Sequence, residues 1–109
     1  MTATIVPLPF PDLVIPEPAP THREQAEAFA AANPALMRWF ATEAHRYLAD
    51  GRSLGMKALV EAARWEYHRI HRIGEFRLNN NWTAHLARIL IEQHPDLAEV
   101  FSLREIRHG

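Results

Sequence analysis

Histidines are the first candidates for chemistry in this chain, which has seven of them and no cysteine. His68 and His71 lie three residues apart, a spacing that puts two imidazoles on adjoining faces of a helix. No HExxH motif is present, and no nearby carboxylate completes a metal site around this pair. We therefore predict structural or surface histidines and no metal. The seven are His22, His45, His68, His71, His85, His94 and His108.

Signatures of catalysis are missing from the sequence. It contains no GxSxG motif, no glycine-rich phosphate loop and no paired-carboxylate spacing, and only four glycines to build tight ligand loops. The lack of cysteine excludes disulfide scaffolds, thiolate zinc sites, iron–sulfur clusters and cysteine nucleophiles. We expect a protein that is not an enzyme and uses no cofactor.

A basic strip is the strongest candidate for binding. Residues 52–77 hold six Lys or Arg against three Glu, although the whole chain has a net charge of −1. Helical spacing lines up Lys57, Glu61, Arg64, His68 and Arg72. Such a strip can contact DNA phosphates or an acidic protein surface. The alternative is a solvated face whose charges pair locally. Those pairs would be Glu61 with Arg64 and Glu66 with Arg69.

Three consecutive asparagines precede the last long helical segment. One of them can cap that helix, and the others can hold a turn or reach a phosphate or an adenine edge. Glu92, on the same polar edge as Arg88, would repel a phosphate. The residues predicted to contact DNA or an acidic partner are Lys57, Arg64, His68, Arg72, Arg77, Asn79, Asn80, Asn81 and Arg88.

The elements that position these residues begin with a proline-rich arm over residues 1–20, which holds six of the eight prolines. Because proline lacks the amide donor that helices and central strands need, we predict an extended arm. Its many apolar residues are unlike those of a solvated tail. We expect the arm to lie along its own domain; the alternative is a partner's surface.

A single helical domain is expected over residues 21–109. Thr21 with Glu24 forms a capping box, Asn33 caps a helix that starts at Pro34, Gly51 ends that helix, and Ser53 caps the next. We predict helices over residues 21–32, 34–50, 54–72, 81–93 and 96–105, with a short extended connection over 75–78. The predicted fold is all-α, a compact bundle of four to five short helices with the extended arm.

Two of these helices have a second apolar face. In the helix over 54–72, Ala58, Ala62 and Trp65 lie opposite the face that contains Met56, Leu59, Val60, Ala63, Tyr67 and Ile70. In the helix over 81–93, Ala84, Ala87 and Ile91 lie opposite Trp82, Leu86, Ile89 and Leu90. We expect the arm and the first helix to cover the second faces. In the alternative, Trp65 and Ile91 contact a partner or a second copy.

Glu43 falls within an apolar arc of the helix over 34–50. The arc consists of Leu36, Trp39, Phe40 and Tyr47. Because a buried carboxylate needs a partner, we predict an ion pair or hydrogen bond with an arginine or histidine from another helix, in preference to the nearby Arg46.

Two amphipathic helices joined by a turn also fit a helix-turn-helix variant that reads DNA with the helix over 81–93. The connection over residues 73–80 is longer than the usual three- or four-residue turn. Three segments, 57–67 (KALVEAARWEY), 76–81 (FRLNNN) and 92–97 (EQHPDL), resemble small uncharacterised proteins of phage and prophage genomes, over about the C-terminal half. This resemblance implies a mobile-element setting, with either a DNA-associated regulator or an inhibitor or adaptor that binds a host protein.

The sequence thus yields two functional hypotheses. The first is a non-enzymatic, DNA-associated regulator of phage or prophage type, which uses the basic helix face and the asparagine-rich loop. The second is a protein-interaction module that binds a host protein through its arm and an apolar helix face; a homodimer is a third arrangement. The longest apolar runs fall short of the 18 or so residues of a membrane helix, and the N-terminus has no basic segment of a signal peptide, so we expect a cytoplasmic protein that does not bind membranes.

Overall fold

The computed structural model describes residues 13–71 and 78–101, and all regular structure within those residues is helical. The α-helices are α1 (His22–Ala32), α2 (Pro34–Ala49), α3 (Met56–His71) and α4 (Thr83–Gln93). Two short 3₁₀ helices, η1 (Asn80–Trp82) and η2 (Pro95–Glu99), flank α4. The predicted all-α bundle is confirmed.

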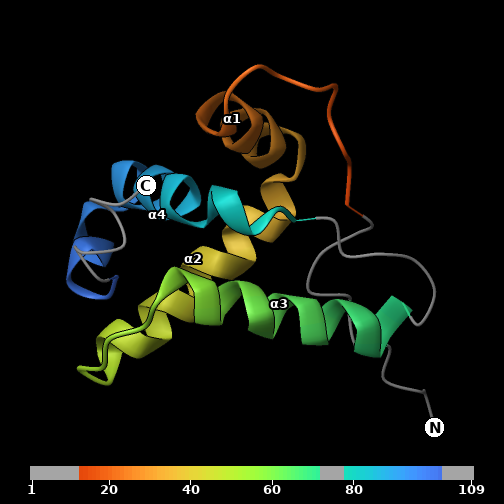
Figure 1. Cartoon of the computed structure of the whole chain (residues 1–109). Helices are drawn as coiled ribbons and strands as arrows, with labels where there is room; N and C mark the ends of the chain where they lie inside the picture. The colour runs from red at the N-terminus through yellow and green to blue at the C-terminus, as the bar shows by residue number, and fades with distance from the viewer. Residues whose placement is uncertain (1–12, 72–77, 102–109) are drawn as a thin grey trace, which may run out of the picture.

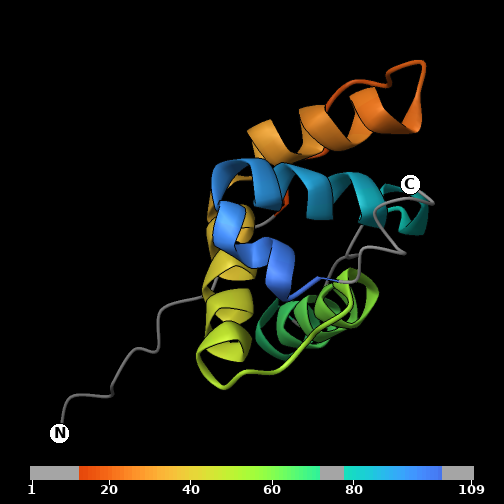
Figure 2. The ribbon, with the colours of Figure 1, turned by 90° about the vertical axis from the view of Figure 1, so that its left-hand side faces the viewer.

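α4 is the central helix of the bundle. It lies between α1 and α3, and α2 crosses beside them to join the two outer helices (Figures 1 and 2). The core therefore combines residues from both ends of the described chain. Its fully buried large side chains are Phe29, Leu36, Phe40, Met56, Val60, Leu86, Leu90, Leu97 and Val100.

Local sequence signals set most of the helix ends. The Thr21 hydroxyl oxygen accepts a hydrogen bond from the Glu24 amide at 3.1 Å, as predicted for a capping box. Gly51, which follows the C-cap residue Asp50 of α2, has a φ of +67°, the left-handed conformation predicted for it. The prediction that Ser53 caps α3 was wrong. α3 begins at Met56, three residues after Ser53, and the Leu54 amide donates to the Val100 carbonyl at 2.9 Å instead of lying in the first turn of the helix.

The end of the described chain differs from the predicted helix over 96–105. Residues 95–99 form the 3₁₀ helix η2, after which Val100 and Phe101 are buried in the core. Parts of three predicted elements lie outside the described residues: residues 102–105 of this helix, residues 75–77 of the extended connection and residues 1–12 of the arm.

Asn33 joins three parts of the structure. It was predicted to cap α2, but its side chain makes no capping hydrogen bond there. Its Nδ2 donates to the Phe29 carbonyl at 2.9 Å and to the Val14 carbonyl at 2.8 Å, while its Oδ1 accepts from the Val14 amide at 2.7 Å. The residue is only 6% exposed. Over residues 13–20 the arm thus lies on its own domain.

Replacing Asn33 with alanine is expected to lower the free energy of unfolding by about 2 to 3 kcal/mol, since it removes three hydrogen bonds and leaves partly buried backbone groups unpaired. Urea denaturation followed by circular dichroism measures this change. The control Asn81→Ala alters an exposed side chain and should change stability by less than about 0.5 kcal/mol. Equal effects of the two substitutions would contradict the anchoring role of Asn33.

Candidate functional site

The outward face of α3 is the main uncovered apolar feature of the described residues. Met56, Leu59, Val60, Ala63 and Tyr67 are buried, which confirms the predicted inner face as far as Tyr67. The side chain of Ile70, the last member of that face, is not described. On the opposite side Ala58 and Ala62 are exposed, and Trp65 is 75% exposed. Within the described residues, the expectation that α1 covers this second face was wrong for α3, because α1 packs on α4 and lies on the far side of the bundle (Figure 2). Residues 1–12 of the arm, the other predicted cover, lie outside the described residues.

The second face of α4 has a different environment. Ala87 is buried, and Ala84 and Ile91 are half-buried, with Ile91 packed against the core. Neighbours on both sides of α4 account for this burial. Among the residues of α4, only Glu92 and Gln93 are exposed. Ile91 is therefore not an open docking residue, and α4 offers little surface to a DNA groove.

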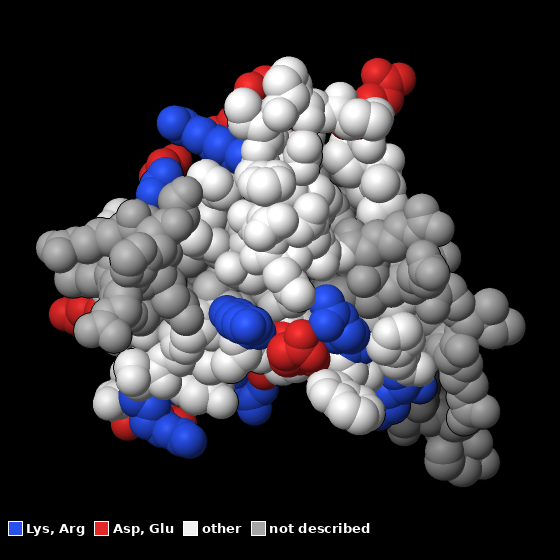
Figure 3. Space-filling model, viewed as in Figure 1, with Lys and Arg blue, Asp and Glu red and all other residues white. Residues whose placement is uncertain are grey.

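The predicted basic strip on α3 carries compensating acids. Arg64 Nη1 lies 2.7 Å from Glu61 Oε1, and Arg69 Nη2 lies 2.9 Å from Glu66 Oε2. Both are the local pairs predicted for a solvated face. Figure 3 shows basic and acidic side chains interspersed over the lower part of the molecule, where α3 lies. In its described part, the predicted basic strip therefore carries both positive and negative charges, and it lies beside the exposed Trp65.

The other members of the predicted contact set are placed as follows. Lys57 and His68 are exposed on α3, whereas Arg72 and Arg77 lie outside the described residues. Arg88 is half-buried on α4. The structure therefore does not collect the predicted cations into one continuous patch within the part of the chain that it describes.

The asparagine run forms the start of η1. Asn79 Oδ1 accepts from the Asn81 amide at 2.8 Å, which is the capping duty predicted for one of the three residues. The Thr83 hydroxyl donates to the Asn80 carbonyl at 3.1 Å. All three asparagines are exposed at the surface. The side chains of Asn80 and Asn81 thus face solvent beside α4.

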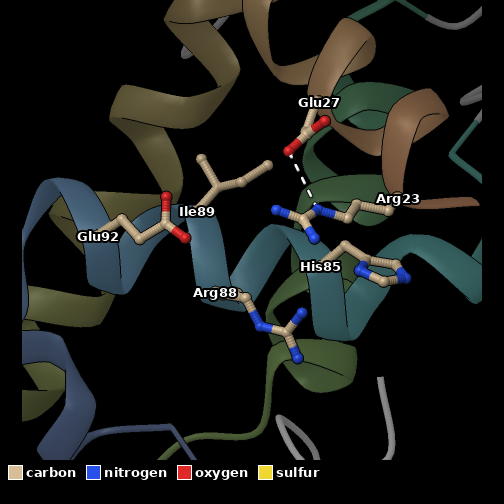
Figure 4. A pocket seen from close by; sticks show the side chains of 6 residues that line it. All are labelled: Arg23, Glu27, His85, Arg88, Ile89 and Glu92. Atoms are coloured by element: carbon tan, nitrogen blue, oxygen red, sulfur yellow. Dashed lines mark hydrogen bonds and ion pairs between the residues drawn. The ribbon is translucent and has the colours of Figure 1, made fainter.

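A small hollow lies between α1 and α4 (Figure 4). Arg23 reaches from α1 toward His85 and pairs with Glu27, its Nε lying 3.4 Å from the carboxylate. The cavity volume is about 10 Å³, which is room for about one water molecule. Sequence reasoning missed Arg23 because α1 and α4 are far apart in the chain. The hollow is lined by Arg23, Glu27, His85, Arg88, Ile89 and Glu92.

His85 is electrostatically the most perturbed group at this hollow. Its Nδ1 is buried and has no hydrogen-bond partner within the described structure. Burial lowers the pKa of His85, and electrostatic repulsion from Arg88, Arg23 and His22 lowers it further, against the opposing effect of Glu27. The imidazole is therefore neutral at neutral pH.

Glu43 is half-buried and has a local partner. Its Oε2 accepts from Arg46 Nη1 at 2.8 Å, and this hydrogen bond raises the pKa of Arg46. The prediction of a partner from another helix was wrong. Arg46 lies one turn further along the same helix, at a spacing from which its guanidinium reaches the edge of the apolar arc.

Three further observations bear on function. In residues 13–71 and 78–101, no group of three His, Asp or Glu side chains is arranged to hold a metal ion. No helix in that part of the chain has the length and apolar composition to cross a lipid bilayer. The chain matches no protein-family model, and comparisons with curated proteins and with solved structures give no match.

His85 should titrate below its ordinary pKa of 6.5 in the folded protein, as followed by NMR of the imidazole signals. Because the folded-state pKa is lowered, the neutral form stabilises the fold fully above pH 6.5, and this contribution is lost as the pH falls from there through the folded pKa. The variant Arg88→Ala removes one repelling charge and should raise the midpoint. A midpoint at or above 6.5 would contradict this description of the hollow.

Proposed function

We propose that this protein is a non-enzymatic protein-interaction module that binds a different polypeptide through the outward face of α3. The supporting observation is the 75% exposure of Trp65 at the centre of that face. Tryptophan is among the residues that contribute most binding energy when a partner's pocket encloses them. An uncovered tryptophan on a small domain therefore favours an interface.

The surroundings of Trp65 define the partner's chemistry. Ala62 and Ala58 lie one and two turns before it and, being small, allow a close approach. The ion pairs of Arg64 and Arg69 with their neighbouring glutamates border the face with both charge signs. The fitting partner is a protein surface with an apolar cleft for the indole ring and a rim that carries both acidic and basic residues.

The biological setting is part of the proposal. The resemblance of three sequence segments to proteins of phage and prophage genomes leads us to propose a host protein as the partner, bound in the cytoplasm. An inhibitor or adaptor needs a recognition face and no catalytic group. Both requirements agree with an exposed indole and with a sequence that lacks catalytic motifs.

A photo-crosslinking amino acid at position 62, an exposed residue on the same face of α3, tests this function while Trp65 is kept. In host lysate, the probe at position 62 is expected to form an adduct with a polypeptide of different sequence, resistant to nuclease and removed by protease. The matched control places the same probe at Thr42, an exposed residue on α2. The variant Trp65→Ala should lose the captured partner while its free energy of unfolding changes by less than about 0.5 kcal/mol, because the side chain is exposed.

Several outcomes would refute the proposal. They are an adduct only with nucleic acid, an adduct only with a second copy, equal adducts from positions 62 and 42, or no adduct at all. Retention of the partner by Trp65→Ala would also refute it, because the indole would then contribute nothing to binding.

DNA association is the second candidate function, since Lys57, His68, Asn80 and Asn81 are all exposed. On this hypothesis, replacing Arg64, Arg72 and Arg77 together with alanine should weaken binding to duplex DNA by about tenfold or more at low salt. Fluorescence anisotropy measures the affinity, and Arg38→Ala, an exposed residue on α2, is the control. Unchanged affinity in the triple variant, or affinity independent of salt, would reject the hypothesis.

A further inference from the structure

A hollow of about 270 Å³ lies where α1 and α4 end beside the start of α2, at one corner of the bundle (Figure 2). Ala30 and Ala31 form its α1 wall, and their single methyl groups are too short to fill the space. Met37 and Ala30 are 5% and 9% exposed and give the hollow an apolar floor. The packing of these helices therefore leaves a partly apolar cavity beside three helix ends.

Every polar side chain that lines this hollow carries a hydrogen-bond donor. These side chains are Arg38 on α2, Gln93 at the end of α4, and His94, the residue after it. Arg38 and Gln93 are exposed, and His94 is half-buried. No Asp or Glu is among the lining residues. The hollow thus has donors at its rim and no carboxylate to accept from them.

These donors are not used elsewhere in the described part of the chain. Among residues 13–71 and 78–101, the side chains of Arg38, Gln93 and His94 make no hydrogen bond or ion pair. By contrast, Arg46 on the same helix as Arg38 bonds to Glu43 at 2.8 Å. Unused donors that converge over an apolar floor are the arrangement of a small-molecule site.

The acids close to His94 in sequence are placed at other contacts. Asp96, two residues after it, has its Oδ2 3.0 Å from His45 Nε2, and the His45 ring lies edge-to-face with the His94 ring at 5.3 Å between centroids. Glu92, two residues before it, lines the separate hollow beside His85. The donor-lined hollow therefore keeps the positive charge that its arginine supplies.

We propose that this hollow binds a small monocarboxylic acid. An ionised carboxylate has only acceptors, and it matches the forked guanidinium of Arg38 with the donors of His94 and Gln93 beside it. A short aliphatic body covers Met37 and Ala30 and buries apolar surface. The volume lies just below the roughly 300–1,000 Å³ of pockets for drug-sized ligands, so the acid is a smaller molecule. No residue of α3 lines the hollow, so this site is independent of the function proposed above.

An NMR titration with sodium hexanoate tests the site. In protein with ¹³C-labelled methionine methyl groups and ¹⁵N-labelled amides, we expect the Met37 methyl and the Gln93 side-chain amide signals to shift and to saturate at millimolar hexanoate or below. The methyl signal of Met56, which is fully buried and does not line the hollow, should not move. Hexan-1-ol and hexylamine have the same chain without the carboxylate and should bind at least about ten times more weakly.

Three variants distinguish this site from a general attraction of anions. Arg38→Ala should weaken hexanoate binding about tenfold or more, because it removes the charge-assisted hydrogen bonds. Lys57→Ala removes the same charge from an exposed position on α3 and should leave the affinity unchanged. Ala31→Leu fills the hollow while every charge is kept, and should abolish binding. Because Ala31 and Arg38 are exposed, their variants should fold, which circular dichroism checks.

Four results would overturn the proposal. They are signals that do not saturate at tens of millimolar hexanoate, equal binding of hexan-1-ol, equal affinities of Arg38→Ala and Lys57→Ala, and full binding by folded Ala31→Leu. The last result would mean that the acid binds outside the hollow.

Discussion

The hydrogen bonds of the Asn33 side chain are the constraint on which the rest of the arrangement depends. One buried amide bonds to the last turn of α1 through the Phe29 carbonyl and to the arm through both backbone groups of Val14. Pro34, the next residue, begins α2 with a φ already suited to a helix. The direction in which α2 leaves α1, and the course of the arm beside α1, are thereby set at one residue.

Signals that act within one helical turn were readable from the sequence. The tertiary structure keeps three such local preferences: the capping hydrogen bond of Thr21, the left-handed conformation of Gly51, and the apolar spacing of Met56, Leu59 and Val60. The role of Asn33 was missed because the same residue type suits an N-cap and a backbone clamp, and only the position of the arm decides between them. Arg23 was missed because its approach to His85 requires α1 and α4 to pack together.

The candidate surface was less predictable than the fold. A count of charges in residues 52–77 suggests a cationic strip, whereas Arg64 and Arg69 both bond to glutamates three residues earlier on α3. Helical periodicity identified a second apolar face around Trp65, but periodicity carries no information on whether α1 or solvent would meet it. Trp65 is exposed because α1 packs on α4 and is therefore not available to cover the outward face of α3.

The central position of α4 also bears on how the chain folds during synthesis. α1, α2 and α3 emerge from the ribosome first, yet the faces of α1 and α3 that enclose α4 have no apolar cover until residues 83–93 follow. Contacts between segments so distant in sequence form late, after the entropy of closing the intervening loop has been overcome. A nascent chain that stalls before α4 exposes these apolar helix faces to solvent. Chaperones bind such faces, and proteases degrade chains that expose them.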